Sequence, residues 1–491
     1  MRAEAVCMVA ALVLGGCAVG PKYVPPSAPV PTTYKEAAAD PSKGPEWKVA
    51  SPQDAMHRGK WWEMFDDPEL NALHEQIDVS NQNIAQAYEN YLAARALVQQ
   101  ARAQRFPVVT TSPNVTRSRS SAGFGAGSGS TGSVGPAAPQ TTNASGQATS
   151  FFSLPVDASW EPDLWGRIRN TINQQRYAAQ VSAADLENVR LSQHSTLAQL
   201  YFQLRGQDAL QKVLDDTVAA DRKTVEYARA QYETGIGDRI SLVEAQNALQ
   251  TAEATAIGLG LARAQFEHAI AVLLGKPPAD FSLPRRPLDA VPPELPPGLP
   301  SALLERRPDI AAAERLMAEA NAQLGLAHAA YYPTVTLSAS GGFESGSFLS
   351  WLAWPSRFWS LGASAAQTIF DGGRRRATVE QFTALYDANV ASYRQTVLTA
   401  FQQVEDALAA ERILTQQVEK QQQAVASARE FFRLEYDRYQ IGIDPYINVL
   451  TAQTTLLAAE QTLTNLQTQR MTSVVQLIAA LGGGWDRSQL H

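Results

Sequence analysis

The feature that most limits how this chain can fold is a glycine turn that occurs twice, at 232–238 and again at 439–445. Each copy interrupts a long helical pattern, and the second follows the first by 207 residues. The same interval separates Gly166 from Gly373. Landmarks that repeat at one interval indicate an internal duplication without insertions. The sequence therefore predicts a helical hairpin in two copies, each reversing direction at its glycine turn.

The helices on either side of these turns are long and rich in Ala, Gln and Leu. The longest would each span about 100 Å at 1.5 Å per residue, which is more than the diameter of a small domain. Apolar residues near heptad spacing, such as Leu186, Leu197 and Leu204, predict coiled-coil packing along them. The strongest helical patterns cover 69–105, 167–233, 241–274, 375–440 and 446–481.

Between the helices, each half carries two segments in which apolar and polar residues alternate. These lie at 108–117 and 152–160 in the first half and at 334–340 and 359–365 in the second. Alternation with period two predicts strands, and strands with one apolar face are typical both of transmembrane β-barrels and of soluble hairpins. Because the smallest closed barrels need about eight strands, four strands would have to share a barrel with further copies of the chain.

Composition and proline content divide the chain into regions. Pro-rich sequence indicates extended chain without a core, and a Ser/Gly-rich tract indicates a long loop. The predicted regions are a signal peptide (1–16), a lipidated Pro-rich tether (17–60), a first repeat (61–283) with a long loop (118–150), a Pro-rich linker (284–300), a second repeat (301–484) and a tail (485–491).

The opening segment ends in Leu-Gly-Gly-Cys at Cys17, which resembles a bacterial lipoprotein signal. The resemblance implies cleavage before Cys17 and attachment of lipid to its thiol, and Ala18 implies sorting to the outer membrane. An ordinary signal peptide with an incidental cysteine is the alternative.

Composition argues against several other functions. The net charge of −7 and the absence of a basic helix face argue against a nucleic-acid partner. The six histidines are scattered without ligand spacing, and no nucleophile motif or phosphate loop is found. We therefore expect no catalytic residues, no metal and no cofactor.

Several motifs, in order, resemble the outer-membrane efflux factors of the TolC/OprM type. They are the Cys17 signal, the segments 160–167, 304–310 and 369–374, and the two glycine turns. The resemblance implies a mainly α protein with a small β part and a two-fold internal repeat. Its long α-helical hairpins would form a periplasmic tunnel, and four strands per chain would contribute to a trimeric, twelve-stranded transmembrane β-barrel. It further implies a lipid-anchored homotrimer in the outer membrane, docked on a periplasmic adaptor protein and an inner-membrane pump of the resistance-nodulation-division (RND) type.

By the same resemblance, the glycine turns form a closed periplasmic tip that opens when the inner helices move outward. Asp444 matches the position of an acidic ring at the constriction, although it could instead cap the helix that begins near Pro445. The residues predicted to form the gate or tip are Asp444, Arg438, Tyr439, Gly442, Asp238, Gly235 and Gly237.

The implied function is the passive exit duct of a tripartite pump that exports small molecules such as drugs or toxic compounds. A channel for type I protein secretion or for metal efflux is an alternative, and a periplasmic coiled-coil scaffold lipoprotein is a third. The pump sets the substrate, so the sequence of this chain does not identify it.

Overall fold

A computed structural model describes residues 19–28, 30–31, 33–36, 59–119, 148–288, 292–293 and 306–484. Cys17, the predicted signal peptide, the tail and most of the 118–150 loop lie outside these residues. The chain forms two compact units, and each contains segments from both halves of the sequence. The first unit includes 96–176 and 319–386, and the second includes 177–318 and 387–491. Each unit is described by itself.

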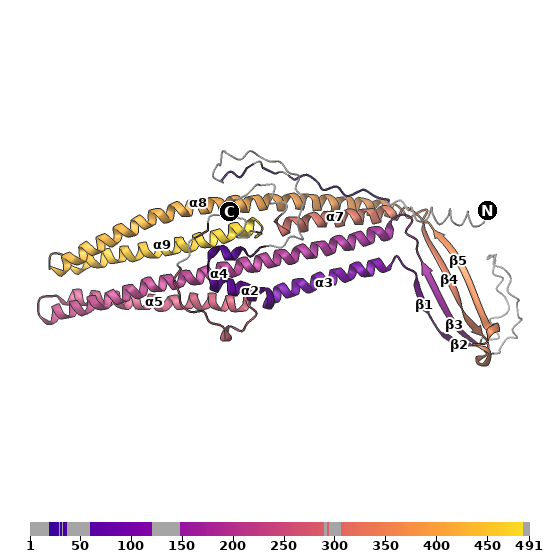
Figure 1. Ribbon diagram of the computed structural model, residues 1–491, viewed down its shortest axis with the longest axis horizontal. Coiled ribbons are helices and arrows are strands. Elements are labelled where there is room, and N and C mark those ends of the chain that lie inside the picture. Colours follow the sequence, from indigo (N-terminus) through magenta and orange to yellow (C-terminus); the bar gives the residue numbers. More distant parts are fainter. Residues whose placement is uncertain are drawn as a thin grey trace. The chain divides into compact units, whose positions relative to one another are not determined.

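The helical duplication predicted from the sequence is confirmed. Helices α4 (Arg167–Glu233) and α8 (Arg374–Gln440) both have 67 residues, and α5 (Arg239–Leu273) and α9 (Tyr446–Ala480) both have 35. Each pair of equivalent helices is offset by 207 residues. Within the second unit, α5 returns along α4 and α9 returns along α8 (Figure 1). The protein therefore contains two hairpins of equal length.

The helix predicted at 69–105 is divided into α2 (Pro68–Ser80) and α3 (Gln82–Ala103). Asn81 is extended, with φ −70° and ψ 121°, and its side-chain oxygen accepts hydrogen bonds from the backbone N–H groups of Asn83 and Ile84. Asn81 thus ends one helix and caps the next, because its side chain satisfies N–H groups that lack helical partners. A further helix, α7 (Pro308–Ala329), opens the second half.

The first unit contains an antiparallel sheet, in which β3 and β4 are central (Figure 1). The strand predicted at 108–117 is two strands, both paired with β3, because Pro113 interrupts it and has no backbone N–H to donate. The other three predicted strands are found with longer bounds. The strands are β1 (Val108–Thr111), β2 (Asn114–Ser118), β3 (Thr149–Trp160), β4 (Thr334–Ser345) and β5 (Arg357–Ala366).

The two central strands approach closely where Pro155 faces Gly342. A Cβ added at Gly342 would lie 2.1 Å from the carbonyl oxygen of Leu154, so only glycine fits there. On the edge strand β5, Trp359 and Leu361 alternate with serine and glycine, and both are mostly exposed. The sheet thus presents large apolar side chains that no described residue covers.

The segment 160–167 fixes the start of α4 within the first unit. The Asp163 carboxylate accepts hydrogen bonds from the backbone N–H groups of Ile168 and Arg169, both at 2.9 Å. The Trp165 indole donates to the Pro333 carbonyl at 2.9 Å and stacks on Tyr332. This motif therefore has a structural role: it caps a long helix and ties the first half of the sequence to the second.

The second unit contains a buried ionic network around Arg205 on α4. The Arg205 side chain is 1% exposed and pairs with Glu69 and with Asp208, the latter at 3.0 Å. Arg263 on α5 reaches Asp208 at 2.7 Å. Arg205 also donates to the Pro284 carbonyl, so the network holds the start of the linker against the hairpin. In the described parts of the chain, no helix is both long and apolar enough to cross a membrane.

Candidate gate at the hairpin tips

The two turns have the same backbone geometry. Gly235 and Gly442 both have φ 77°, a left-handed conformation that favours glycine. In the first turn, the Ile236 N–H donates to the carbonyl of residue 231, five positions earlier, and Gly235 donates to residue 232. The second turn repeats this pattern 207 residues later. Both helices thus end in a Schellman motif, which satisfies their last carbonyl groups.

The residues that follow the two glycines act differently. Asp238 caps α5, since its carboxylate accepts a hydrogen bond from the Ser241 N–H at 2.8 Å, and this bond lowers the pKa of Asp238. Asp444 forms an ion pair with Arg438 of its own turn. The hydrogen bond to Asp444, and after it the charge of Asp444, raises the pKa of Arg438. Because the N-cap of α9 is Pro445 and has no side-chain cap, the alternative that Asp444 caps α9 is wrong.

The first turn leaves little room for a larger residue at Gly237. A Cβ added at Gly237 would lie 2.8 Å from the Cβ of Gln231. Gln231 in turn receives a hydrogen bond from Tyr439, so its position is important for the contact between the hairpins. Gly237 therefore allows the first turn to fold tightly over the end of α4.

Tyrosines join the tip of one hairpin to the tip of the other. The Tyr439 hydroxyl on α8 donates to the side-chain oxygen of Gln231 on α4 at 3.1 Å. In the other direction, the Tyr227 hydroxyl donates to the backbone carbonyl of Gln440 at 3.2 Å. The rings of Tyr227 and Tyr439 meet edge to face, 5.8 Å apart. Among the predicted gate residues, Tyr439 thus forms a hydrogen bond with the opposite hairpin.

An apolar cluster lies directly behind these tyrosines. It is formed by side chains from all four hairpin helices, and burial of their apolar surface holds the two tips together. Burial also raises the pKa of Tyr439. The buried members are Val225, Ala228, Ala245, Tyr439, Tyr446 and Val449.

A buried carboxylate continues this contact further from the tip. Asp221 on α4 is 3% exposed, and its Oδ1 accepts a hydrogen bond from Gln453 Nε2 on α9 at 2.5 Å. Burial raises the pKa of Asp221, and the bond from Gln453 offsets part of this effect. The sequence marked Gln453 only as a landmark of the repeat. Its counterpart, Gln246, has no such partner among the described hydrogen bonds, so the duplication gave no signal for the contact.

Each hairpin is also bridged internally. Arg222 on α4 pairs with Glu253 on α5 at 2.8 Å. The equivalent residues of the second half, Arg429 and Glu460, pair at 2.6 Å. The ion pairs within a hairpin therefore involve other residues than the bonds between the hairpins.

The outermost side chains of both turns are apolar and exposed. Ile236 is 82% exposed, Ile441 70% and Ile443 62%. Exposed apolar residues that gather at one place commonly mark a contact surface for another protein.

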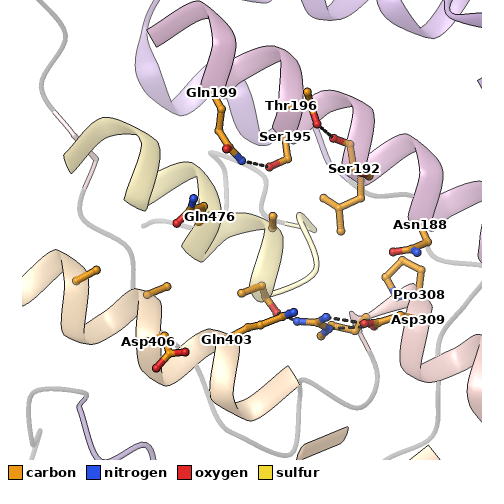
Figure 2. Close-up of a pocket in the computed structure, with 16 residues that line it drawn as sticks. Asn188, Ser192, Ser195, Thr196, Gln199, Pro308, Asp309, Gln403, Asp406 and Gln476 are labelled. Atoms are coloured by element: carbon orange, nitrogen blue, oxygen red, sulfur yellow. Dashed lines mark hydrogen bonds and ion pairs between the residues drawn. The ribbon is translucent and has the colours of Figure 1, made fainter. Parts of the chain in front are cut away.

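Away from the tips, the second unit has a polar groove of about 500 Å³ between α4, α7, α8 and α9 (Figure 2). Amides, hydroxyls and two carboxylates line it, among them Gln403, Gln476 and Asp406. At one end, Arg307 binds Asp309 with two hydrogen bonds and donates to the Ala480 carbonyl at 3.0 Å. From the segment 304–310, prominent in the sequence, Arg307 and Asp309 thus fix the start of α7 on the end of α9.

Two equal helical hairpins joined at their tips, together with an antiparallel sheet, define the class of protein: a mainly helical protein built from a duplicated hairpin. The comparisons with known proteins agree. The sequence matches the family described as outer membrane efflux protein over residues 73–276 and 299–483. The chain belongs to this family, and it is an outer-membrane efflux channel.

Individual relatives support this assignment over almost the whole chain. The toluene efflux pump outer membrane protein TtgC of Pseudomonas putida is 32% identical, with 97% of this chain and 94% of the relative covered. The solved outer-membrane channel OprN has a TM-score of 0.82 at 28% identity, covering 96% of this chain and all of that one. The open state of MtrE from Neisseria gonorrhoeae has a TM-score of 0.80 at 25% identity, covering 96% and 99%. These relatives are channel proteins rather than enzymes.

Proposed function

We propose that this chain is the exit duct of a tripartite efflux pump that exports small molecules such as drugs or toxic compounds, and that the hairpin tips are its gate. The observation that carries the gate is the arrangement of bonds at the tips. A few hydrogen bonds and one apolar cluster join the hairpins, whereas separate ion pairs hold each hairpin together. Breaking the first set opens the tip without unfolding a hairpin. The MtrE channel, solved in an open state, supports a tip with two states.

The working unit that we propose is a homotrimer. The sheet of one chain has edge strands β1/β2 and β5, and each pairs on one side only among the described strands. Unpaired strand edges are avoided when neighbouring copies complete the sheet. Three copies would close a twelve-stranded barrel in the outer membrane, with Trp359 and Leu361 available to face lipid.

The partners that we propose are a periplasmic adaptor protein and an inner-membrane pump of the RND type. The exposed isoleucines at the turns, Ile236, Ile441 and Ile443, offer the adaptor an apolar contact. Binding there would compete with the bonds between the tips, because both involve the same turns. The relative TtgC is named as the outer membrane protein of a toluene efflux pump. The pump in that name supports the proposed partners, and toluene supports small apolar substrates.

The proposed membrane anchor is lipid attached to Cys17. The cysteine lies outside the described residues, but described parts of the chain that follow it form hydrogen bonds with the two units. Val19 donates to the Trp165 carbonyl at 3.2 Å in the first unit. In the second unit, the Glu405 carboxylate accepts hydrogen bonds from the backbone N–H groups of Lys35 and Glu36. A bound tether of this kind supports the proposal that the protein is held to the membrane at its N-terminus.

The test is removal of the gene from its host, followed by measurement of drug and toluene accumulation. We expect the deletion strain to accumulate more of both, and the restored gene to reverse the change. Purified protein should also conduct ions across planar bilayers. Normal efflux with loss of a secreted protein would favour the protein-secretion channel, and metal sensitivity alone would favour metal efflux. Absence of conductance would favour the scaffold.

A further inference from the structure

Two histidines that are far apart in the sequence meet inside the second unit. His74 on α2 and His194 on α4 lie with their Nδ1 atoms 2.8 Å apart, which is a hydrogen-bond distance. Both rings stack on Trp62 of the short helix η1 (Trp61–Phe65), with ring centroids 4.3 and 4.5 Å from the indole. His74 is fully buried and His194 is 5% exposed. The pair joins η1 and α2 to the long helix α4.

The neighbours of the pair fix where its protons lie. His194 Nε2 is 3.0 Å from the Asp78 carboxylate, which can only accept, so Nε2 carries the proton. Partial burial would raise the pKa of Asp78, but the hydrogen bond from His194 and the charges of Arg190 and Lys60 hold it below its ordinary value. In a neutral His194, Nδ1 is then bare and accepts from His74 Nδ1–H. His74 Nε2 is left bare, buried and without a hydrogen-bond partner in the described chain.

A further proton has no favourable place in this arrangement. If it binds His74 Nε2, it forms a buried N–H group without an acceptor, which is costly. The bridging proton could instead move from His74 Nδ1 to His194 Nδ1. His74 would then have no N–H group, and the added proton would again have to bind its Nε2. Burial, and after it the charge of His194, lowers the pKa of His74 well below its ordinary value. The contact therefore resists binding a proton while it is formed.

Four of the charged groups around the pair form two ion pairs. Lys60 binds Glu75 at 3.0 Å and Arg190 binds Glu187 at 2.8 Å. None of the other described charges acts on His74, whereas Arg190 and Lys60 act on Asp78. The titratable and charged groups that face this region from its surrounding elements are Lys60, Glu63, Glu75, Asp78, Glu187 and Arg190.

One member of the pair borders a cavity. A cavity of about 320 Å³ is lined by Trp62, Asp78 and His194, but His74 is not part of its wall. If the rings separate, the cavity gives a proton bound there both solvent and the nearby Asp78 carboxylate. His74, His194 and Asp78 do not form a metal site, since no three His, Cys, Asp or Glu side chains among the described residues converge into one.

We propose that the His74–His194 contact is an acid-released latch: it holds η1 and α2 on α4 at neutral pH, and proton binding to the separated rings releases them. The folded contact binds fewer protons than the open one, so closure is favoured above the pKa of a free histidine, about 6.5, and is lost as the pH falls below it. For one proton, the opening equilibrium of α2 should rise up to about thirtyfold between pH 7.5 and 5.0.

Hydrogen exchange of the full-length protein in detergent tests this proposal. Protection factors of the α2 amides, corrected for the intrinsic effect of pH, should fall up to about thirtyfold between pH 7.5 and 5.0. His74→Phe keeps an aromatic ring on Trp62 and removes the titrating nitrogens, so the fall should disappear or reverse. The exposed His268 on α5 provides the control, and His268→Gln should behave as the unchanged protein does.

The same fall in the His74→Phe variant would overturn the latch, because other groups would then be responsible. Constant protection of α2 in the unchanged protein would also overturn it, and that measurement needs no variant to fold. The latch would be supported if the decrease is confined to η1 and α2, requires His74 and is retained in His268→Gln.

Discussion

Gln453 and Asp221 form a hydrogen bond between the two hairpins of one chain, with Gln453 Nε2 2.5 Å from the Asp221 carboxylate. The bond lies on the apolar side of the tip, near Tyr446, whose buried hydroxyl has no hydrogen-bond partner in the described chain. Asp221 raises the pKa of Tyr446, after the larger effect of burial. A buried carboxylate with one good donor is sensitive to the loss of that donor.

Replacing Gln453 should therefore loosen the tip. Gln453→Ala leaves the Asp221 carboxylate buried without its donor, at a cost of about 1–3 kcal/mol. We expect a lower melting temperature and a higher conductance in planar bilayers, since α9 is less firmly held to α4. Gln246→Ala is the matched control, because Gln246 is the repeat equivalent of Gln453 on α5. Equal effects of the two substitutions would contradict a role for the bond between hairpins.

Asp221→Asn should act in the opposite direction and change the response to pH. The pKa of Asp221 is higher in the folded tip than the value of about 3.9 in an unfolded chain. At pH values between the two pKa values, the folded chain binds a proton at Asp221 that the unfolded chain does not. This carboxyl therefore favours folding in acid, and it lowers the stability as the pH rises through the folded pKa.

The asparagine can still accept from Gln453 and carries no buried charge. We expect a higher melting temperature at pH 7 and the loss of this acid-stabilising contribution when melting is followed from pH 7 to 4. The exposed Asp216 on the same helix supplies the control, and Asp216→Asn should leave the pH profile in place. A lower melting temperature for Asp221→Asn at pH 7 would show that the charge itself stabilises the tip.

The regular parts of the fold could be predicted because they depend on local sequence. Helix α4 begins and ends where the sequence predicted, since Asp163 precedes it and Gly235 follows it. Single residues that interrupt an element were missed: Asn81 divides α2 from α3, and Pro113 divides β1 from β2. Asparagine and proline often interrupt helices and strands. In each case, however, the pattern on both sides of the residue favoured one continuous element.

The contacts between elements could not be predicted from the sequence. Tyr439 was singled out, but its partner Gln231 lies 208 residues away on another helix. His74 and His194 were dismissed as scattered, although the fold brings their rings together. Periodicity shows which face of a helix is buried and says nothing about which residue it meets. The sequence also could not show that Asp444 pairs with Arg438. An aspartate ahead of a proline can either cap the next helix or form an ion pair.

Lipid attachment at Cys17 gives a direct prediction. Cys17→Ser should abolish incorporation of labelled palmitate, because the serine hydroxyl cannot form the thioether. The trimer should still assemble in part, since the helices and the sheet bury their own surfaces. Continued labelling of the variant would show that the lipoprotein signal is incorrect, and Cys7→Ser should not alter labelling of the mature protein.

The oligomer can be measured by mass in detergent. We expect a trimer, because four strand positions per chain cannot close a barrel of at least about eight strands. The unpaired edges at β1/β2 and β5 are then completed by neighbouring copies. A monomer that keeps its full β-sheet content would rule out both the shared barrel and the tunnel.

The ion pair between Arg438 and Asp444 leads to the last prediction, on the gate itself. In the proposed trimer three copies of Asp444 lie around the closed tip, and unpaired carboxylates held close together would repel one another. In the structure of the single chain, Asp444 is paired with Arg438 of its own turn, and the same pairing in three copies would remove most of that repulsion. Arg438→Ala leaves the three carboxylates unpaired, so we expect single-channel conductance or open probability to rise.

Asp444→Ala removes the carboxylate and leaves three arginines, whose side chains are about half exposed and can turn to solvent. Its effect should be smaller, and the double variant Arg438→Ala/Asp444→Ala should conduct less than Arg438→Ala alone, because the repelling groups are absent. Arg433→Ala supplies the control, since Arg433 lies on the same helix and pairs with Glu430 and Asp437 instead. If all four variants conduct as the unchanged channel does, the charges at the turn do not set the gate, and the tyrosine and apolar contacts behind it alone keep the tip closed.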